Sequence, residues 1–223
     1  MDLSFRLYKD VCPDAVVLEI KNTDAVFIAP YIVPDNSKYK IEKIFSVVDF
    51  IIKNFKDKYI YIMGDLNARC GTPSSTLQYA RNPDAIINSN GRKLLSICND
   101  NDLVVVNGLK HNGVCYDSNF TYFRGELRSQ NDWLITNTVD TVESFDILPK
   151  MVVSDHAPCA ISIKYSLSTT SLLILERCAG GNFDYSKHEK STFLKPKIRL
   201  RNINYDKVRV HILIGKHATT RPR

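Results

Sequence analysis

The sequence lacks any apolar run long enough to cross a membrane, and it lacks a leader-like start. Its longest apolar runs, such as 172–175, have the length of a strand, whereas a spanning helix needs roughly 20 apolar residues. The first residues carry Asp2, Arg6 and Lys9 with no apolar core between them, which is not the pattern of a secretory signal. We therefore expect no membrane partner, and a protein that is made and kept inside the cell, in the nucleus or the cytoplasm.

Paired cysteines are also missing. The six cysteines are widely scattered, with no C-x-x-C pair and no cluster with histidine at the spacing of a zinc site. This pattern favours reduced thiols that serve as small core side chains over disulfides or a structural metal site. The six are Cys12, Cys70, Cys98, Cys115, Cys159 and Cys178.

Positive charge is plentiful, but it is concentrated at one end. Residues 187–223 hold eleven Lys or Arg against two acids, a net +9, so the rest of the chain carries −3 of the total +6. A basic tail attracts nucleic acid by releasing counterions from phosphates. A solvated extension without a specific partner also explains the charge, and composition alone slightly favours this second interpretation. We expect a domain over 1–166 and a poorly ordered basic linker or tail over 167–223.

Hydrophobic periodicity predicts alternating strands and helices. Apolar residues at helical spacing over 41–55 predict a helix, and 92–100 predict a second one. The segments 68–90 and 108–118 are predicted to be loops. Strands are predicted at 15–20, 25–33, 59–63, 103–106, 119–123, 131–136 and 159–164. This order indicates sheets covered by helices, which is an α/β sandwich.

Polar residues recur directly beside the predicted strands. Asp65 and Asn67 follow 59–63, Asp132 opens the strand near 133–136, and the tripeptide Ser154-Asp155-His156 precedes 159–164. Strand ends are where an α/β scaffold places accessible yet rigidly held side chains. A lone Asp after a strand is more often a turn former, so only the joint pattern predicts a functional site.

Three carboxylates and a histidine are too acidic to bind a phosphodiester directly, but a hard cation would change this. Mg²⁺ binds one or two carboxylates together with substrate oxygens and water, and it polarises the phosphoryl group. A carboxylate such as Asp65 can align or deprotonate a water. An Asp–His pair can stabilise the charge that develops on a phosphate. The set therefore predicts metal-dependent phosphodiester chemistry.

Several segments resemble the endonuclease/exonuclease/phosphatase superfamily, and most of all the endonuclease domain of non-LTR retrotransposons. The resemblance covers roughly residues 12–165, in the family's order. It rests on FIAPYIVP at 27–34, YIMGDLNARCG at 61–71, NGRKLLSICNDNDLVVVN at 90–107, FTYFRGELRSQNDW at 120–133, NDWLITN at 131–137 and SDHAP at 154–158. It implies a DNase I-like fold, a two-layered β-sandwich flanked by helices.

The resemblance also implies roles for individual residues. Asp65 would activate the nucleophilic water, Asn67 would position it, and His156 would contact the scissile phosphate with its ring oriented by Asp132. Asp155 would lie at a site for Mg²⁺ or Mn²⁺. Tyr31 would sit beside the phosphate or the leaving group, and Ser154 and Thr121 would support the site. DNA would be the substrate. The basic segment at 194–209 is loosely similar to the stretch that joins such endonucleases to a reverse transcriptase.

Two departures from the family pattern stand out. The family begins with a strand bearing an Asn and a second strand ending in a metal-binding Glu, whereas this sequence starts downstream of both, so we expect a fold that is incomplete at the N-terminus. Glu19 does not replace that ligand and is expected to face solvent or a neighbouring strand. Asn131 stands where the family has an apolar residue, and a buried Asn needs partners or costs roughly 1–3 kcal/mol.

Three functions therefore remain open. The chain is an active metal-dependent, DNA-nicking endonuclease, or a non-catalytic remnant of a retroelement whose activity is lost with the missing strands, or a protein that binds nucleic acid through its basic tail. Other substrates of the superfamily include inositol phosphates, sphingomyelin and RNA ends, and fold-level analogy does not separate them. The likeness of residues 90–133 to retroelement endonucleases favours DNA.

Overall fold

The computed structural model describes residues 5–8, 15–21, 24–34, 52–73, 77–150, 154–164, 174–176, 197–199 and 211–213. Of the helix predicted over 41–55, residues 52–54 are helical and residue 55 begins a turn. The rest of that segment lies outside the described residues. In the parts of the chain that the structure describes, none of the helices could span a bilayer.

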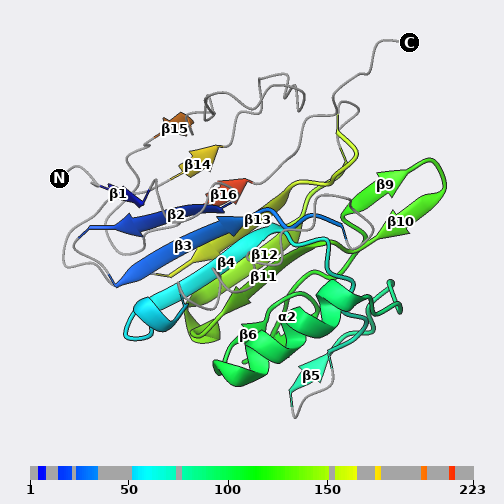
Figure 1. Cartoon of the computed structure of the whole chain (residues 1–223), viewed down its shortest axis with the longest axis horizontal. Helices are drawn as coiled ribbons and strands as arrows, with labels where there is room; N and C mark the ends of the chain where they lie inside the picture. The colour runs from blue at the N-terminus through cyan, green and yellow to red at the C-terminus, as the bar shows by residue number, and fades with distance from the viewer. Residues whose placement is uncertain are drawn as a thin grey trace.

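A six-stranded mixed sheet forms the centre of the domain (Figure 1). Its strands, in spatial order, are β1 (Phe5–Tyr8), β2 (Ala15–Ile20), β3 (Ala25–Pro30), β4 (Tyr59–Asp65), β11 (Asp132–Thr136) and β6 (Val104–Val105). Strands β3 and β4 are parallel, and the other neighbouring pairs are antiparallel. The strands predicted at 15–20, 59–63 and 131–136 are thus confirmed as members of one sheet.

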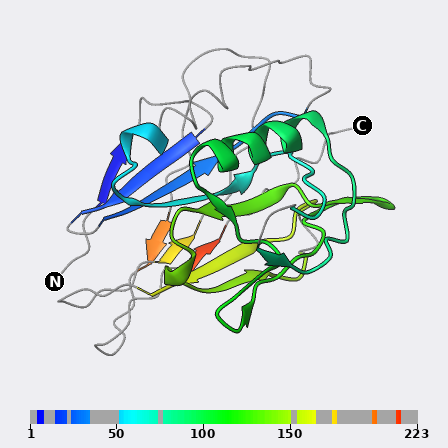
Figure 2. The same cartoon turned by 90° about the horizontal axis from the view of Figure 1, so that it is seen from below.

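Both faces of this sheet are covered. The hairpin of β12 (Val142–Ile147) and β13 (Cys159–Ile163) packs on one face and helix α2 (Ser89–Asp100) on the other, as Figure 2 shows from below. Alternate residues of β4 therefore enter different cores: Tyr61 and Met63 contact the β12–β13 side, and Ile60 and Ile62 contact the α2 side. Burial on both faces explains why 59–63 is an unbroken apolar run rather than an alternating one.

Short strands complete the described structure. Strands β5 (Gln78–Tyr79), β7 (Leu109–His111) and β8 (Val114–Cys115) form a small sheet, and β9 (Tyr122–Arg124) and β10 (Leu127–Ser129) form a projecting hairpin (Figure 1). A 3₁₀ turn, η1 (Val139–Thr141), precedes β12. Strands β14 (Ile174–Glu176), β15 (Lys197–Arg199) and β16 (His211–Leu213) form a third small sheet, in which β16 lies close to β13.

The loop predicted over 108–118 is wrong, because β7 and β8 form a hairpin there. Asn112 and Gly113 connect the two strands with φ angles of 48° and 79°. Two consecutive positive φ angles are what a two-residue hairpin turn with the right twist requires, and Asn-Gly is the pair that adopts them most readily. The loop predicted over 68–90 is likewise interrupted by β5.

Two expectations about single side chains are confirmed. Glu19 faces the neighbouring strand, where its carboxylate accepts the hydroxyl hydrogen of Tyr8 and pairs with Lys58. Cys70, Cys98 and Cys159 are free and buried, and Cys115 is free and exposed. Burial raises the pKa of the Cys70 and Cys98 thiols, as expected for unreactive core side chains. Cys12 and Cys178 lie outside the described residues.

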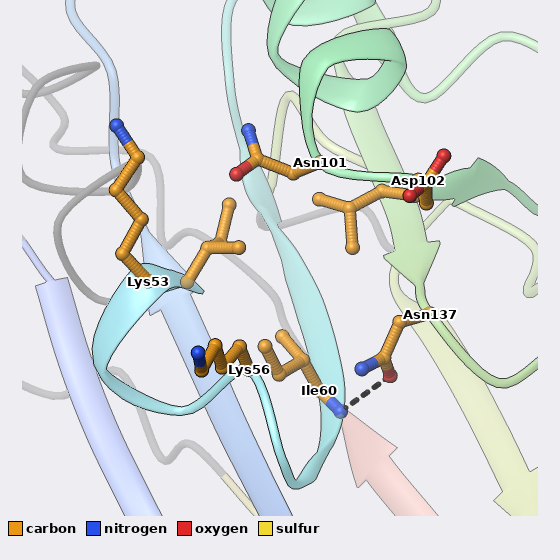
Figure 3. A pocket seen from close by; sticks show the side chains of 8 residues that line it. Lys53, Lys56, Ile60, Asn101, Asp102 and Asn137 are labelled. Atoms are coloured by element: carbon orange, nitrogen blue, oxygen red, sulfur yellow. Dashed lines mark hydrogen bonds between the residues drawn. The ribbon is translucent and has the colours of Figure 1, made fainter.

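A hollow of about 370 Å³ lies at the start of β4 (Figure 3), whereas Asp65 is the last residue of this strand. Ile52, Ile60 and Leu103 give it an apolar floor, and Lys53, Lys56, Asn101, Asp102 and Asn137 line its rim. The side-chain oxygen of Asn137 is already occupied by the N–H of Ile60, at 2.8 Å. The residues that line the hollow do not include Asp65, so the hollow and the polar residues at the end of β4 are separate features.

Gln130 provides a stability test of the core. Its side chain is 0% exposed, and neither its amide nitrogen nor its amide oxygen has a hydrogen-bond partner in the described structure. Because an unpaired buried amide is costly, we expect Gln130→Met to raise the free energy of unfolding by about 1–2 kcal/mol. Urea denaturation measures this, with the exposed Gln78→Met as the matched control. A lower stability for Gln130→Met would show that the amide has a partner.

Candidate active site

Strands β4 and β11 bring two carboxylates to one edge of the central sheet. The strands are antiparallel, and their register pairs Asp65, the last residue of β4, with Asp132, the first residue of β11. Strand β3 ends at the same edge, where Tyr31 forms a parallel bridge with Asp65 and the N–H of Ile32 donates to the Asp65 carbonyl oxygen at 2.9 Å. The edge expected from the strand-end pattern therefore exists.

His156 reaches this edge from the β12–β13 side. The segment 154–158 pairs with the chain entering β9: the N–H of Ala157 donates to the Thr121 carbonyl at 2.7 Å, and the N–H of Phe123 donates to the Asp155 carbonyl at 2.8 Å. The imidazole then lies between the two carboxylates. Its Nδ1 is 2.8 Å from Asp132 Oδ2, and its Nε2 is 3.7 Å from Asp65 Oδ2.

The contact between His156 and Asp132 orients the ring. An ionised carboxylate only accepts hydrogen bonds, so Nδ1 donates to Asp132, and Nε2 is directed towards Asp65. All three side chains are buried, with exposures of 7% for Asp65, 4% for Asp132 and 5% for His156. Charges in such surroundings are weakly screened and interact strongly. The ring of Tyr122 packs beside the imidazole, with ring centroids 5.1 Å apart.

Asn67 lies next to this group in an uncommon backbone conformation. Its φ is +44°, a left-handed value that only a few non-glycine residues adopt, Asn among them. Its N–H points to Asp65 Oδ1 at 3.2 Å, and its side-chain Nδ2 donates to the carbonyl of Ile32 at 2.7 Å. These contacts link Asn67 to the ends of both β3 and β4, beside the carboxylate that it was expected to assist.

Asn131 has the partners that its burial demands. Its N–H donates to Thr121 Oγ1 at 2.9 Å, its carbonyl accepts the N–H of Leu66 at 3.0 Å, and its Nδ2 lies 3.5 Å from Asn67 Oδ1. The same Thr121 oxygen accepts the N–H of Asp132 at 3.0 Å. Thr121, which is 0% exposed, therefore fixes the start of β11.

The other predicted site residues lie around the three central side chains. Ser154 is buried, and its Oγ accepts the N–H of His156 at 3.0 Å, which shapes the turn that presents the ring. Tyr31 and Asp155 are half-buried. Asp155 is adjacent to His156 in the chain, but the described cluster of metal-ligating side chains consists of Asp65, Asp132 and His156 and does not include it.

The cluster has the composition of a divalent-metal site. One ligand atom from each of Asp65, Asp132 and His156 can be chosen so that all three lie within 4.8 Å of one another. Hard cations such as Mg²⁺ prefer carboxylate oxygens and use one or two of them, completing their shell with water and substrate. Mn²⁺ accepts the same oxygens and also imidazole. The two buried carboxylates therefore fit either ion.

An ion pair behind the site was not predicted from the sequence. The guanidinium of Arg69 binds both carboxylate oxygens of Asp84, at 2.8 and 2.7 Å, and Asp84 also accepts the N–H of Gln130 at 3.0 Å. This pair thus ties the loop after β4 to the approach of β11. Burial pushes the pKa of Asp84 upward, but the hydrogen bonds from Arg69, Gln130 and Ile86 outweigh it, so the pKa lies below its ordinary value.

Removing Arg69 tests this connection. Asp84 is 1% exposed and Arg69 is 28% exposed, so we expect Arg69→Met to cost about 3 kcal/mol at pH 7, the low end for a broken buried pair. The pKa of Asp84 is lower in the folded state than in the unfolded state, so the ion pair stabilises the fold fully at a pH above the unfolded-state pKa of about 3.9. This stabilisation is lost as the pH falls towards the folded-state pKa. The deficit measured by urea denaturation should therefore shrink in acid. Arg92→Met, which removes an exposed arginine, is the control, and an equal loss for both variants would contradict the expectation.

The fold has counterparts among solved structures. The endonuclease domain of TRAS1, a telomere-specific non-LTR retrotransposon, matches with a TM-score of 0.52 and 19% identity, over 73% of this chain and 69% of that one. A 3′-5′ exonuclease (NExo) from Neisseria meningitidis matches with a TM-score of 0.49 and 14% identity, over 73% and 71%. An endonuclease/exonuclease/phosphatase family protein from Leptotrichia buccalis matches with a TM-score of 0.46 and 16% identity, over 68% and 52%.

No family model and no curated protein matches the sequence. The similarity to the TRAS1 domain nevertheless confirms the fold expected from the sequence, the DNase I-like fold of the endonuclease/exonuclease/phosphatase type. Within this fold, the described Asp65–Asp132–His156 cluster is buried at the edge where β4 ends and β11 begins.

Proposed function

We propose that this chain is a phosphodiesterase dependent on Mg²⁺ or Mn²⁺ that nicks DNA, an endonuclease of the retrotransposon type acting inside the cell. The observation that carries the proposal is the convergence of Asp65, Asp132 and His156 at one sheet edge, with ligand atoms within 4.8 Å of one another. Two carboxylates suit a hard cation, and a histidine oriented by a carboxylate suits a developing oxyanion.

Each side chain has a distinct task in this proposal. His156 acts as an imidazolium: its Nδ1 donates to Asp132, and its protonated Nε2 donates to an oxygen of the scissile phosphate. Asp65, 3.7 Å from that nitrogen, accepts the proton of the attacking water. Asn67 orients the water and Tyr31 lies beside the leaving oxygen. Ser154 and Thr121 hold the backbone that carries His156 and Asp132.

Asp65 and Asp132 would hold the metal in this proposal, and Asp155, next to His156 in the chain, is proposed as a further ligand. When bound, the cation neutralises the phosphate and stabilises the charge that develops on it. The chain itself supplies a buried floor for the reaction, because its three central side chains are almost inaccessible to solvent.

Basic side chains near the site support a polyanionic substrate. The β9–β10 hairpin joins the site through the bridge between Tyr122 and His156 and carries the exposed Arg124 and Arg128. Lys150 lies over the Phe123 ring of the same hairpin, 5.7 Å from its centroid. Contacts of this kind neutralise a phosphate backbone without reading sequence, which suits DNA better than a small phosphate ester.

Nicking of supercoiled plasmid by the purified chain tests the proposed function. We expect conversion to the open circle with Mg²⁺ or Mn²⁺ and none with EDTA, and faster cleavage of plasmid than of RNA ends, inositol phosphates or sphingomyelin. Protein that never nicks and shows little or no cooperative melting transition would favour a non-catalytic retroelement remnant instead.

A second candidate function, nucleic-acid binding through the basic tail, rests on the +9 charge of residues 187–223. If the tail binds, deleting 187–223 should weaken DNA binding and reduce its salt dependence, since each phosphate contact contributes to the slope of affinity against salt. Fluorescence anisotropy with a labelled duplex at several salt concentrations measures both quantities. Binding that the deletion leaves unchanged would rule this function out. In the parent element the tail would lead to a reverse transcriptase region.

A further inference from the structure

The N-terminus of helix α2 packs directly on the loop that carries Asn67. A Cβ added to Gly91 would overlap the carbonyl oxygen of Arg69, so only glycine allows the helix to approach so closely. Asn88 caps the helix, and its Oδ1 accepts the N–H of Gly91 at 2.7 Å and the N–H of Arg69 at 2.9 Å. One side chain therefore serves both the helix end and the loop.

Two asparagines of this helix end bind the backbone of Asn67. Nδ2 of Asn88 donates to the Asn67 carbonyl at 2.9 Å, and Nδ2 of Asn90 points to the same carbonyl at 3.3 Å. Asn90 also donates to the carbonyl of Val33 at 3.1 Å, and it is only 5% exposed. Asn90 thus connects the loop after β3 to the loop after β4.

These contacts support a backbone conformation that is costly by itself. The left-handed φ of +44° at Asn67 is sparsely populated in non-glycine residues and persists where its surroundings hold it. The same conformation lets the N–H of Asn67 point to Asp65 Oδ1 and its side chain reach the Ile32 carbonyl. If the backbone of Asn67 moved, its amide and the carboxylate of Asp65 would both change orientation.

We propose that Asn88 and Asn90 are positioning residues, which hold Asn67 in its left-handed conformation and thereby set the orientation of Asn67 and Asp65 for phosphodiester cleavage. The inference rests on the proposed nuclease function. Asn88 and Asn90 lie at the start of α2. They contact neither the phosphate nor a metal, and they act through the backbone of Asn67.

Asn88 offers a substitution that separates positioning from helix capping. Asp and Ser are as good as Asn at the N-cap, but neither carries an amide hydrogen to donate to the Asn67 carbonyl. Asn88→Asp adds a charge and Asn88→Ser does not. A fall in kcat that both variants share therefore results from loss of the amide that donates to the Asn67 carbonyl. Asn101→Ala is the matched control, since it removes an asparagine amide from the Ile97 carbonyl at the other end of α2.

The test combines steady-state nicking kinetics with NMR of the Asn67 backbone and side-chain amides. For both Asn88 variants we expect kcat to fall on the order of tenfold to a hundredfold, with KM within about twofold of wild type and with shifted Asn67 resonances. Asn101→Ala should keep wild-type kcat and wild-type Asn67 resonances.

Two results would overturn the inference: unshifted Asn67 resonances in both Asn88 variants, or shifted resonances with kcat unchanged in an active protein. Failure of the wild-type protein to nick would instead defeat the nuclease function. The Asn67 resonances of the Asn88 variants would then decide whether Asn88 holds Asn67.

Discussion

Asp132→Asn is expected to lower kcat for plasmid nicking by about 10²–10⁴-fold while leaving the fold intact. The carboxylate is 2.8 Å from Nδ1 of His156, and a neutral amide in its place no longer stabilises the imidazolium, the form that holds the ring through Nδ1 and donates a charged hydrogen bond from Nε2. Removing one donor to a developing oxyanion costs about 10²–10³-fold, and removing the orienting carboxylate of a catalytic Asp–His pair costs up to about 10⁴-fold. The backbone of residue 132 should stay in place, because its N–H donates to Thr121 and its register with Asp65 does not involve the side chain.

Kinetics of nicking and a thermal melt measure the two parts of this expectation. The matched control is Asp140→Asn, which changes another Asp–His pair, with Asp140 2.7 Å from Nε2 of His111, at a carboxylate that is 74% exposed. We expect the control to nick as fast as wild type. Asp132→Asn protein with wild-type kcat would show that the His156–Asp132 pair has no part in the reaction.

Gly64→Ala is expected to destabilise the protein by about 3 kcal/mol or more, the upper range for overpacking. A Cβ at Gly64 would overlap the carbonyl oxygen of Pro30 and come within 3.1 Å of its Cδ. Since the clash is with backbone, β3 and β4 would have to separate where Tyr31 pairs with Asp65. Nicking should therefore fall together with stability.

Urea denaturation compares this variant with Gly125→Ala. Gly125 has a φ of +60°, and a Cβ there would meet no atom within 4 Å, so its cost should be only that of a left-handed backbone, about 1–2 kcal/mol. If Gly64→Ala were no more destabilising than Gly125→Ala, the close approach of β3 and β4 at the site would be contradicted.

Much of the fold followed from local sequence patterns. The apolar run at 59–63 and the periodic segment at 92–100 needed no tertiary information to be assigned as a strand and a helix, and both are present as β4 and α2. Strand β12 had no such signal, because Glu143, Ser144 and Asp146 interrupt it. It exists through pairing with β13, the next strand along the chain.

Some residues of the candidate site could likewise be predicted from the sequence, and others could not. Asp65, Asp132 and His156 could be grouped from the sequence because each adjoins a strand, and rigid strands that end at one edge bring such residues together. Asn88 lies 21 residues from its partner Asn67, in a segment whose pattern indicates only a turn and a helix start. The Arg69–Asp84 pair is hidden for the same reason: nothing local marks two residues of one loop as partners.

The rate of metal-dependent plasmid nicking by wild-type, Asp65→Ala and His156→Ala proteins, purified side by side, tests the central claim most directly. If Asp65 and His156 converge on one phosphate, the wild-type protein nicks with Mg²⁺ or Mn²⁺ and both variants fall to the background seen with EDTA. Equal rates for the three proteins would mean that the observed nicking is a contaminant or arises elsewhere in the molecule, and the account would be wrong.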